Sequence, residues 1–153
     1  MSLLAAPFEP TTRCQVFAHW SIQLPTSLRS PLVPDPQYWH ARDEHRSVSL
    51  TSMVITEHGR PVSQKRIARQ IQMSFEGTPV ALPPGLEGWG REVDAEPSAI
   101  ASRAVTGIIA ARGRVLIVTV TGDDIAWATS VWLSIRHNAL PVSANELLSD
   151  RQR

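Results

Sequence analysis

The sequence predicts an α+β fold, in which helices pack on an antiparallel sheet of about four strands. Apolar residues alternate with polar ones over residues 14–24, and β-branched residues dominate residues 46–56, as is typical of strands. In residues 62–75 and 124–138 the apolar residues recur at helical spacing instead. Between these two stretches lies a strand–turn–strand pattern over residues 101–121. The predicted order is therefore two strands, a helix, two strands and a helix.

The length and composition favour one domain that covers the whole chain. A chain of 153 residues buries roughly 70% of the surface that its unfolded form exposes, so it can fold without a disulfide or a metal. Hydrophobic residues make up 42% of the chain and charged residues 19%, as in an ordinary globular protein. Within the single domain 1–153 we expect an irregular arm over 1–12, a core over 13–138 and an extension over 139–153.

The charge balance argues against two classes of partner. The 15 basic residues are opposed by 14 acidic ones, so the chain lacks the broad positive field that captures nucleic acid or anionic membranes. No apolar run approaches the ~20 residues that a membrane span needs. We therefore expect no nucleic acid partner and no membrane span.

The N-terminus and the cysteine content bear on the compartment. The first residues, MSLLAAPFEP, lack the positive start of a signal peptide and are interrupted by two prolines. The single cysteine, Cys14, allows no internal disulfide. We expect a cytoplasmic protein.

The first predicted strand, CQVFAHWSIQL, has one apolar and one weakly charged face. The apolar face holds every second residue: Cys14, Val16, Ala18, Trp20, Ile22 and Leu24. The outer face is polar apart from Phe17. An aromatic residue on such a surface can anchor a partner, so Phe17 is a candidate binding residue.

Two stretches rich in proline and glycine, residues 25–45 and 77–99, are predicted to be long loops. Each contains a tryptophan, Trp39 in the first and Trp89 in the second. A loop tryptophan either pins its loop to the core or contacts a partner. We favour the packing interpretation and keep both residues, with Phe17, as candidate binding contacts.

The two predicted helices differ in exposure. In residues 62–75, Ser63 is placed to be the N-cap, and Lys65, Arg66 and Arg69 lie opposite the apolar face, as in a surface helix. Residues 124–138 are apolar around most of the helix, so this second helix should be more buried. We expect Asp123 to cap it.

The C-terminal residues PVSANELL contain a capping box. Ser143 stands at the N-cap position and Glu146 three residues later. This pattern predicts a short helix that begins at residue 144 and packs on the domain.

The cluster of histidines, carboxylates and arginines in YWHARDEHRSVSLTS suggests a metal or acid–base site. His40 and His45 are five residues apart, however, which separates them by about 140° on a helix and places them on opposite faces of a strand. Asp43 and His45 could share a strand face, but two ligands do not complete a catalytic zinc site. We interpret the cluster as a solvated entry to a strand and expect no metal and no cofactor.

No other stretch contains a complete catalytic set. Cys14 and His19 are also five residues apart on a predicted strand, so they face opposite ways and cannot share a proton. The glycines of PPGLEGWG neither follow a predicted strand nor open a predicted helix, as a phosphate-binding loop would require. We therefore favour a protein without catalytic activity.

The segment ASRAVTGIIAARGRVLIVTVTGDDIAWATSVWLSIR looks like the C-terminal half of small uncharacterised bacterial proteins. The layout of residues 13–138 resembles the PsbP-like group of α/β/α sandwiches. This resemblance implies a non-catalytic binding module, because the known members of that group mostly bind other proteins. It carries over no functional residue.

Three functions remain open at this stage. The first is an adaptor-like or chaperone-like module whose partner is another protein. The second is a small enzyme whose site is assembled from the two long loops, for instance from His40, Asp43 and Glu92. The third is a protein that binds a small apolar molecule between the sheet and a helix, using the loop tryptophans.

Overall fold

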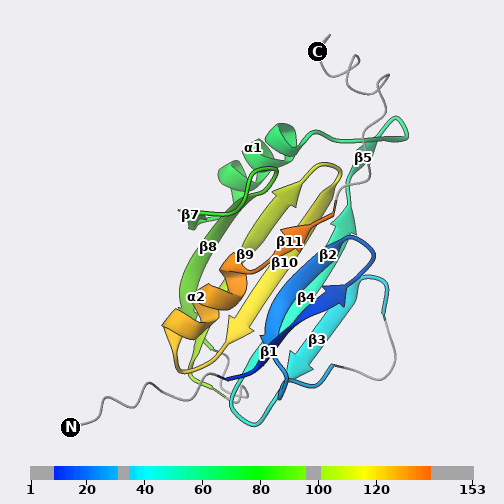
Figure 1. Ribbon diagram of the computed structural model, residues 1–153. Coiled ribbons are helices and arrows are strands. Elements are labelled where there is room, and N and C mark those ends of the chain that lie inside the picture. Colours follow the sequence, from blue (N-terminus) through cyan, green and yellow to red (C-terminus); the bar gives the residue numbers. More distant parts are fainter. Residues whose placement is uncertain (1–8, 31–34, 96–100, 139–153) are drawn as a thin grey trace, which may run out of the picture.

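The computed structural model describes residues 9–30, 35–95 and 101–138, and these residues form eleven strands but only two helices (Figure 1). The fold is mostly β. The prediction of an α+β fold, an α/β/α sandwich around about four strands, is therefore wrong. The main sheet alone has six strands, and a three-stranded sheet and a two-stranded ribbon accompany it.

The larger sheet is antiparallel throughout. In spatial order its strands are β3 (Tyr38–Arg42), β4 (Ser47–Val54), β10 (Arg114–Thr121), β9 (Arg103–Ala111), β8 (Glu87–Asp94) and β7 (Thr78–Val80). β3 and β7 are thus the two edges of this sheet. β10 lies in the middle and is apolar on both faces, as suits a strand that is covered on both sides.

Different elements cover the two faces of the larger sheet (Figure 1). One face packs against α2 and the smaller sheet, and the opposite face packs against α1 at one end. The bounds of these elements are α1 (Gln64–Ser74), α2 (Ile125–Leu133), β1 (Thr11–Val16), β2 (Trp20–Pro25) and β11 (Arg136–His137). The ribbon of β5 (Thr56–Glu57) and β6 (Arg60–Pro61) leads from β4 into α1.

Two hydrophobic clusters hold these layers together. The larger one fills the space between the larger sheet and the elements α2, β1 and β2, and its largest members, Trp20 and Trp132, are at most 1% exposed. The smaller one lies under α1, where Ile67 and Ile71 pack against Trp89. Trp20, which the alternating pattern placed on the apolar face, is confirmed in the core.

The first predicted strand, residues 14–24, is in fact a hairpin of β1 and β2 joined by residues 17–19. Val16 pairs with Trp20, and Cys14 pairs with Ile22. Paired residues are an even number of positions apart, so they share a face and the alternation continues through the turn. The period predicted the correct apolar face but could not reveal the turn.

Both predicted long loops contain strands. β3 lies within residues 25–45, and β7 and β8 lie within residues 77–99. Glycines are rare in strand interiors, which is why β8 resembles a loop in the sequence. A Cβ on Gly88 would lie 2.7 Å from Cδ1 of Leu82, so a larger residue here would have to displace the end of that side chain.

The hairpin over residues 101–121 is confirmed as β9 and β10, and Gly113 adopts a φ of 71° in the turn between them. The first helix is also confirmed, with Ser63 as its N-cap, which accepts the N–H of Arg66 at 3.3 Å. The predicted helix from residue 144 and most of the predicted arm over residues 1–12 lie outside the described residues.

The second helix differs from its prediction at both ends. Asp124, not Asp123, is the N-cap and accepts the N–H groups of Ala126 and Trp127. The helix ends at Leu133 instead of residue 138, because the chain then adds β11 to the smaller sheet. Neither helix of the described residues is long and apolar enough to cross a membrane.

Candidate functional site

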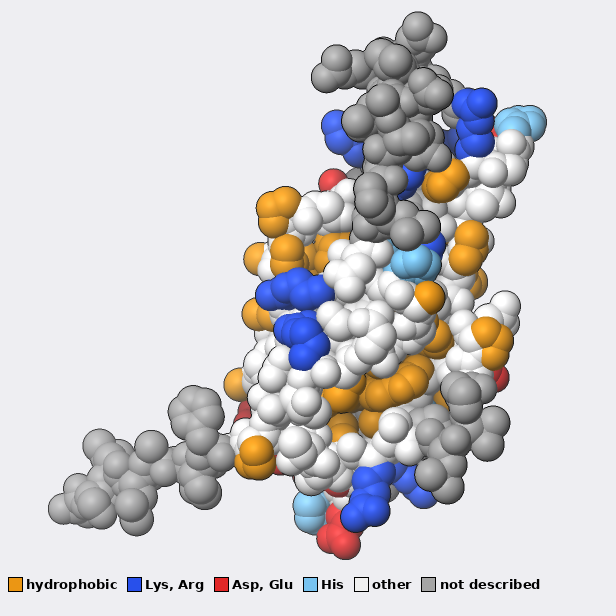
Figure 2. Space-filling view, turned by 45° about the vertical axis from the view of Figure 1, so that its right-hand side comes forward, with side chains coloured by type: hydrophobic (Ala, Val, Ile, Leu, Met, Phe, Trp, Pro, Cys, Tyr) orange, Lys and Arg blue, Asp and Glu red, His pale blue; other side chains and the backbone are white. Residues whose placement is uncertain are grey.

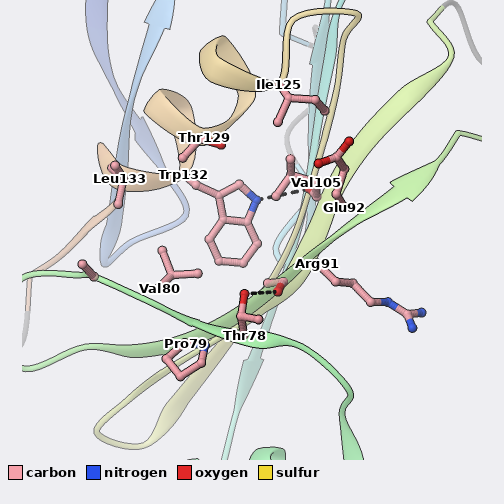
Figure 3. A pocket seen from close by; sticks show the side chains of 12 residues that line it. Thr78, Pro79, Val80, Arg91, Glu92, Val105, Ile125, Thr129, Trp132 and Leu133 are labelled. Atoms are coloured by element: carbon pink, nitrogen blue, oxygen red, sulfur yellow. Dashed lines mark hydrogen bonds between the residues drawn. The ribbon is translucent and has the colours of Figure 1, made fainter.

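A groove of about 380 Å3 lies between α2 and the β7 edge of the larger sheet (Figure 3). One wall consists of Ile125, Thr129 and Leu133, which are four residues apart and therefore lie on one side of α2. The opposite wall consists of β7, with Pro79 and Val80. We call this cavity the α2–β7 groove. Its volume lies within the range of 300–1,000 Å3 that is usual for ligand pockets.

Trp132 forms the floor of the groove, and its indole ring points from α2 toward β8 and β9 (Figure 3). The indole N–H donates a hydrogen bond to the backbone oxygen of Val105 at 3.2 Å. Gly90 and Gly107 pair across β8 and β9 beside the ring, and a Cβ on Gly107 would lie 2.9 Å from its edge. The glycines let the tryptophan approach the strands closely, so packing and a hydrogen bond both fix the floor.

The polar groups of the groove stand at its rim and are largely paired. The carboxylate of Glu92 forms an ion pair with Arg103. The hydroxyl of Thr78 donates to the backbone oxygen of Gly90 at 3.3 Å. Leu133 is 39% exposed and continues the apolar lining to the surface. This arrangement suits the binding of apolar groups, since its single carboxylate among the described lining residues is already paired and the side chain of Arg91 extends away from Trp132 (Figure 3).

The three candidate binding residues lie elsewhere. Phe17 lies in the turn between β1 and β2, and Trp39 lies on β3; both are half-buried against the larger cluster. Trp89 does not lie in a loop but on β8, where it is 9% exposed and packs under α1. None of the three lines the α2–β7 groove. A binding role for them stays a prediction, and the burial of Trp89 leaves little of its ring for a partner.

The structure does not bring together the residues of the alternative enzyme site. His40 on β3 and Glu92 on β8 are four strands apart in the sheet, which is roughly 19 Å at the usual strand spacing. They also occupy opposite faces, because Glu92 pairs with Val105, which packs on the larger cluster, whereas His40 pairs with Ser49 on the other side. Asp43 therefore cannot form one site together with His40 and Glu92.

Asp43 instead holds the turn between β3 and β4. Its Oδ1 atom accepts the backbone N–H groups of His45 and Arg46 at 2.8 and 2.7 Å. The guanidinium of Arg46 donates to Asp43 and Glu9, and it lies 4.8 Å from the ring centroid of Trp127. Within the described part of the chain, no three His, Cys, Asp or Glu side chains are placed to hold a metal ion.

This network lowers the pKa of both carboxylates. Burial acts to raise the pKa of Asp43, but hydrogen bonds from the Arg46 side chain and from two backbone N–H groups outweigh it. The pKa of Glu9 also lies below its usual value, chiefly because it accepts a hydrogen bond from Arg46. The network thus ties the chain before β1 to the β3–β4 turn and to α2, which is a structural role.

His137 on β11 is a titratable group that the sequence did not single out. Burial, followed by the nearby charges of Arg114 and His19, lowers its pKa to about 4. Its Nε2 atom lies 3.3 Å from Nη1 of Arg114, and its ring lies 4.6 Å from that of Trp20. Because His137 lies in the smaller sheet, its protonation should affect the stability of the fold. It does not line the α2–β7 groove.

The environment of Cys14 disfavours a reactive thiolate. It is half-buried on β1, and burial raises the pKa of its thiol. A raised pKa lowers the fraction of reactive thiolate.

Known proteins resemble this chain in fold alone. No family model matches it, and no curated protein matches it. A crystal structure from Bacteroides thetaiotaomicron VPI-5482 is similar, with a TM-score of 0.57 and 8% sequence identity. The similarity covers 87% of this chain and 53% of that one, so this chain spans about half of the other.

The groove was missed in the sequence, although two signals for it are present. Ile125 and Leu133 are apolar residues of α2 that the fold leaves partly or largely exposed. Gly90 and Gly107 stand inside strands, where glycine commonly marks a close approach of another group. Only their pairing in space shows that the approaching group is Trp132.

Proposed function

We propose that this protein is a non-catalytic binding module that receives an apolar segment of another protein in the α2–β7 groove. The observation that carries the proposal is the ready-formed apolar cavity above Trp132. Its floor is 1% exposed and held by the hydrogen bond to Val105. A preformed site needs little ordering when a ligand binds, and this favours affinity.

The shape of the groove favours an extended segment. The α2 wall from Ile125 to Leu133 spans nine residues, and its ends are about 12 Å apart along the helix. A volume of about 380 Å3 is well below that of 12 Å of a helix ~10 Å wide, so the groove can receive side chains but not a whole helix. In an extended chain, alternate side chains point the same way about 7 Å apart. Two large apolar side chains at positions i and i+2 would therefore fill the groove.

Side chains rather than main chain should carry this recognition. β7 is an edge strand of only three residues, and its middle residue is Pro79. Proline has no N–H to donate, so β7 is a poor template for an added strand. The partner segment would lie across the groove without extending the sheet.

A cytoplasmic location also remains part of the proposal. A small apolar molecule is the second candidate ligand, since the volume of the groove also suits one. The experiment must therefore separate a protein from a small molecule.

Site-specific photo-crosslinking in cells tests the proposal. A benzophenone amino acid is introduced at Thr129, which lines the groove, or at Ser130, its exposed neighbour on α2 outside the lining. We expect a protein adduct from position 129 and none from position 130. Mass spectrometry should place the crosslink in a segment with two large apolar residues two positions apart.

A second variant links the adduct to the groove. Leu133→Asp should abolish it and leave the fold intact, because Leu133 is already 39% exposed. Equal adducts at both positions, or none at position 129, would contradict the proposal. A bound small molecule in native mass spectrometry, lost in Leu133→Asp and without any protein adduct, would establish the second candidate instead.

A further inference from the structure

A second cavity, of about 560 Å3, lies between the β5–β6 ribbon and the first turns of α1. Its lining joins the ribbon to the helix: Glu57, Arg60, Pro61, Val62, Ser63, Lys65, Arg66 and Arg69. We call this cavity the basic cleft. Three of its basic residues follow the outer face of α1, and Arg60 faces them from the ribbon.

The basic cleft has a local excess of positive charge. Four cationic side chains line it against one carboxylate, that of Glu57, which pairs with Arg66. Within the described part of the chain, Arg60, Lys65 and Arg69 have no carboxylate partner. The whole chain has a net charge of only +1, so this excess is local. Figure 2 shows Lys and Arg side chains in separate groups, several of them at the upper end, where Figure 1 places β5.

The walls of the cleft are fixed by the backbone. The N–H of Val62 donates to the oxygen of Ile55 at 3.0 Å, and the N–H of Gly113 donates to the oxygen of Val62 at 2.8 Å. A Cβ on Gly113 would lie 2.6 Å from Cβ of Pro61, so this glycine lets the β9–β10 turn close against the ribbon. The backbone that carries the cationic side chains is therefore held in place by these contacts.

The size and lining of the cleft argue against a single small anion. A volume of about 560 Å3 is many times the ~30 Å3 share of one water molecule, so a lone phosphate would leave most of it empty. The hydroxyl of Ser63 already accepts the N–H of Arg66, so the helix start is capped within the chain. Pro61 and Val62 add apolar surface that a polyphosphate would not use.

From these features we propose that the basic cleft binds an acidic segment of a partner protein, one in which carboxylates alternate with apolar side chains. Lys65 and Arg69 are one helical turn apart, so they can reach successive carboxylates of such a segment. Arg60 contacts it from the opposite wall, and Pro61 and Val62 receive the apolar side chains. Arginine suits this task because its planar guanidinium binds a carboxylate through two hydrogen bonds.

This site is separate from the α2–β7 groove. α1 and α2 cover opposite faces of the larger sheet. The two proposals are therefore independent of each other. A substitution in the basic cleft should not affect crosslinking at Thr129.

Fluorescence anisotropy on the full chain tests the proposal. The probe is a fluorescein-labelled peptide of alternating glutamate pairs and leucines, and the control peptide carries glutamine at each glutamate. We expect binding of the acidic peptide, at least tenfold weaker binding of the glutamine peptide, and weakening as salt rises. Lys65→Glu combined with Arg69→Glu should lower the affinity for the acidic peptide at least tenfold.

A matched variant controls for net charge. Arg29→Glu combined with Arg42→Glu changes the charge equally at two exposed residues beside β3, the sheet edge farthest from α1. We expect it to change the affinity less than twofold, and both variants should keep the circular dichroism spectrum of the wild type. An equal loss in both variants would overturn the proposal. So would competition by inorganic tripolyphosphate at a lower concentration than the unlabelled peptide, since the cleft would then prefer phosphate.

Discussion

Gly107 on β9 packs directly against Trp132 on α2. A Cβ on Gly107 would lie 2.9 Å from Cη2 of the indole and 2.0 Å from the backbone oxygen of Trp89. Its partner across the ladder, Gly90, is less crowded, because its Cβ would meet Cγ2 of Val80 at 3.4 Å as its nearest atom. Two paired glycines at the same groove therefore face different steric limits.

We expect Gly107→Ala to lower the free energy of unfolding by about 3 kcal/mol or more, because the backbone of β8 cannot yield to a methyl group at that distance. Gly90→Ala should change it by about 1 kcal/mol or less, since its contacts are ordinary and alanine restricts the unfolded chain. Urea denaturation of both variants measures the difference. Equal effects of the two substitutions would mean that neither the backbone of β8 nor Trp132 approaches Gly107 this closely.

Arg46 connects three parts of the chain. Its replacement should therefore lower the free energy of unfolding more than replacement of an ordinary surface arginine. Arg46→Ala leaves the carboxylates of Asp43 and Glu9 without their partner and uncovers the Trp127 ring. We expect a loss of about 1–3 kcal/mol in the free energy of unfolding. The free energy of unfolding of Arg46→Lys should lie between those of the wild type and Arg46→Ala, because lysine keeps the charge but not the planar guanidinium.

Arg42→Ala is the control for this prediction. Arg42 is exposed on β3, and its backbone, not its side chain, bonds to Arg29. We expect a change within about 0.5 kcal/mol, as for most surface substitutions. A similar loss for Arg42→Ala and Arg46→Ala in urea denaturation would show that the Arg46 network adds nothing specific.

The sequence predicts the local elements of this protein better than its sheet. The cap of α1 at Ser63 and the hairpin of β9 and β10 were correctly predicted, because each depends on residues close together in the sequence. β7 and β8 were missed, because Pro79, Gly88 and Gly90 are typical of loops. They become strand residues only because β7 pairs with β8, β8 pairs with β9, and Leu82 and Trp132 pack against them. Without those strands, the sheet was predicted to be too narrow.

The candidate site was out of reach of the sequence for the same reason. The α2–β7 groove has one wall from β7 and one from α2. No sequence pattern predicts that these two elements face each other. The sequence predicted part of the basic cleft, since it placed Lys65, Arg66 and Arg69 together on the outer face of the helix. The contribution of Arg60 depends on the ribbon that folds back beside α1.

Stability should fall on mild acidification because of His137. Its pKa is lowered from 6.5 to about 4, so between these values the unfolded chain binds a proton that the folded protein excludes. The stabilisation is complete above about pH 6.5 and is lost as the pH falls toward 4. We expect a loss of about 1–2 kcal/mol over this window, less than the full shift would give, since solvent screens a half-buried group.

His137→Gln isolates this effect. The variant should show a flatter stability profile between pH 6.5 and pH 4, measured by urea midpoints at each pH. The lowered pKa values of Glu9 and Asp43 act with the same sign at lower pH, since their stabilisation is present above their usual values of 4.5 and 3.8 and lost below them. That lower part of the profile should be the same in the variant and the wild type. An unchanged slope above pH 4.5 in His137→Gln would assign the acid sensitivity to another group.

A substitution in the turn between β5 and β6 should stabilise the protein. Its two loop residues, His58 and Gly59, have φ angles of 52° and 74°, the positive values of a type I′ hairpin turn. Histidine is a costly residue there, and its side chain is 85% exposed, so little packing compensates. Asparagine accepts this conformation more readily, and Asn-Gly is the preferred pair for such a turn. We expect His58→Asn to raise the free energy of unfolding by about 0.5–1 kcal/mol.

Phe17→Asn is the contrasting case for that prediction. Phe17 also has a positive φ, 55°, but its ring packs against the larger hydrophobic cluster. Relief of the backbone strain there should be outweighed by the lost packing, with a net loss of about 2 kcal/mol or more. Urea denaturation of the two variants should thus give shifts of opposite sign. A destabilised His58→Asn would mean that the exposed histidine contributes contacts to the ribbon, and that the turn is held by more than its backbone geometry.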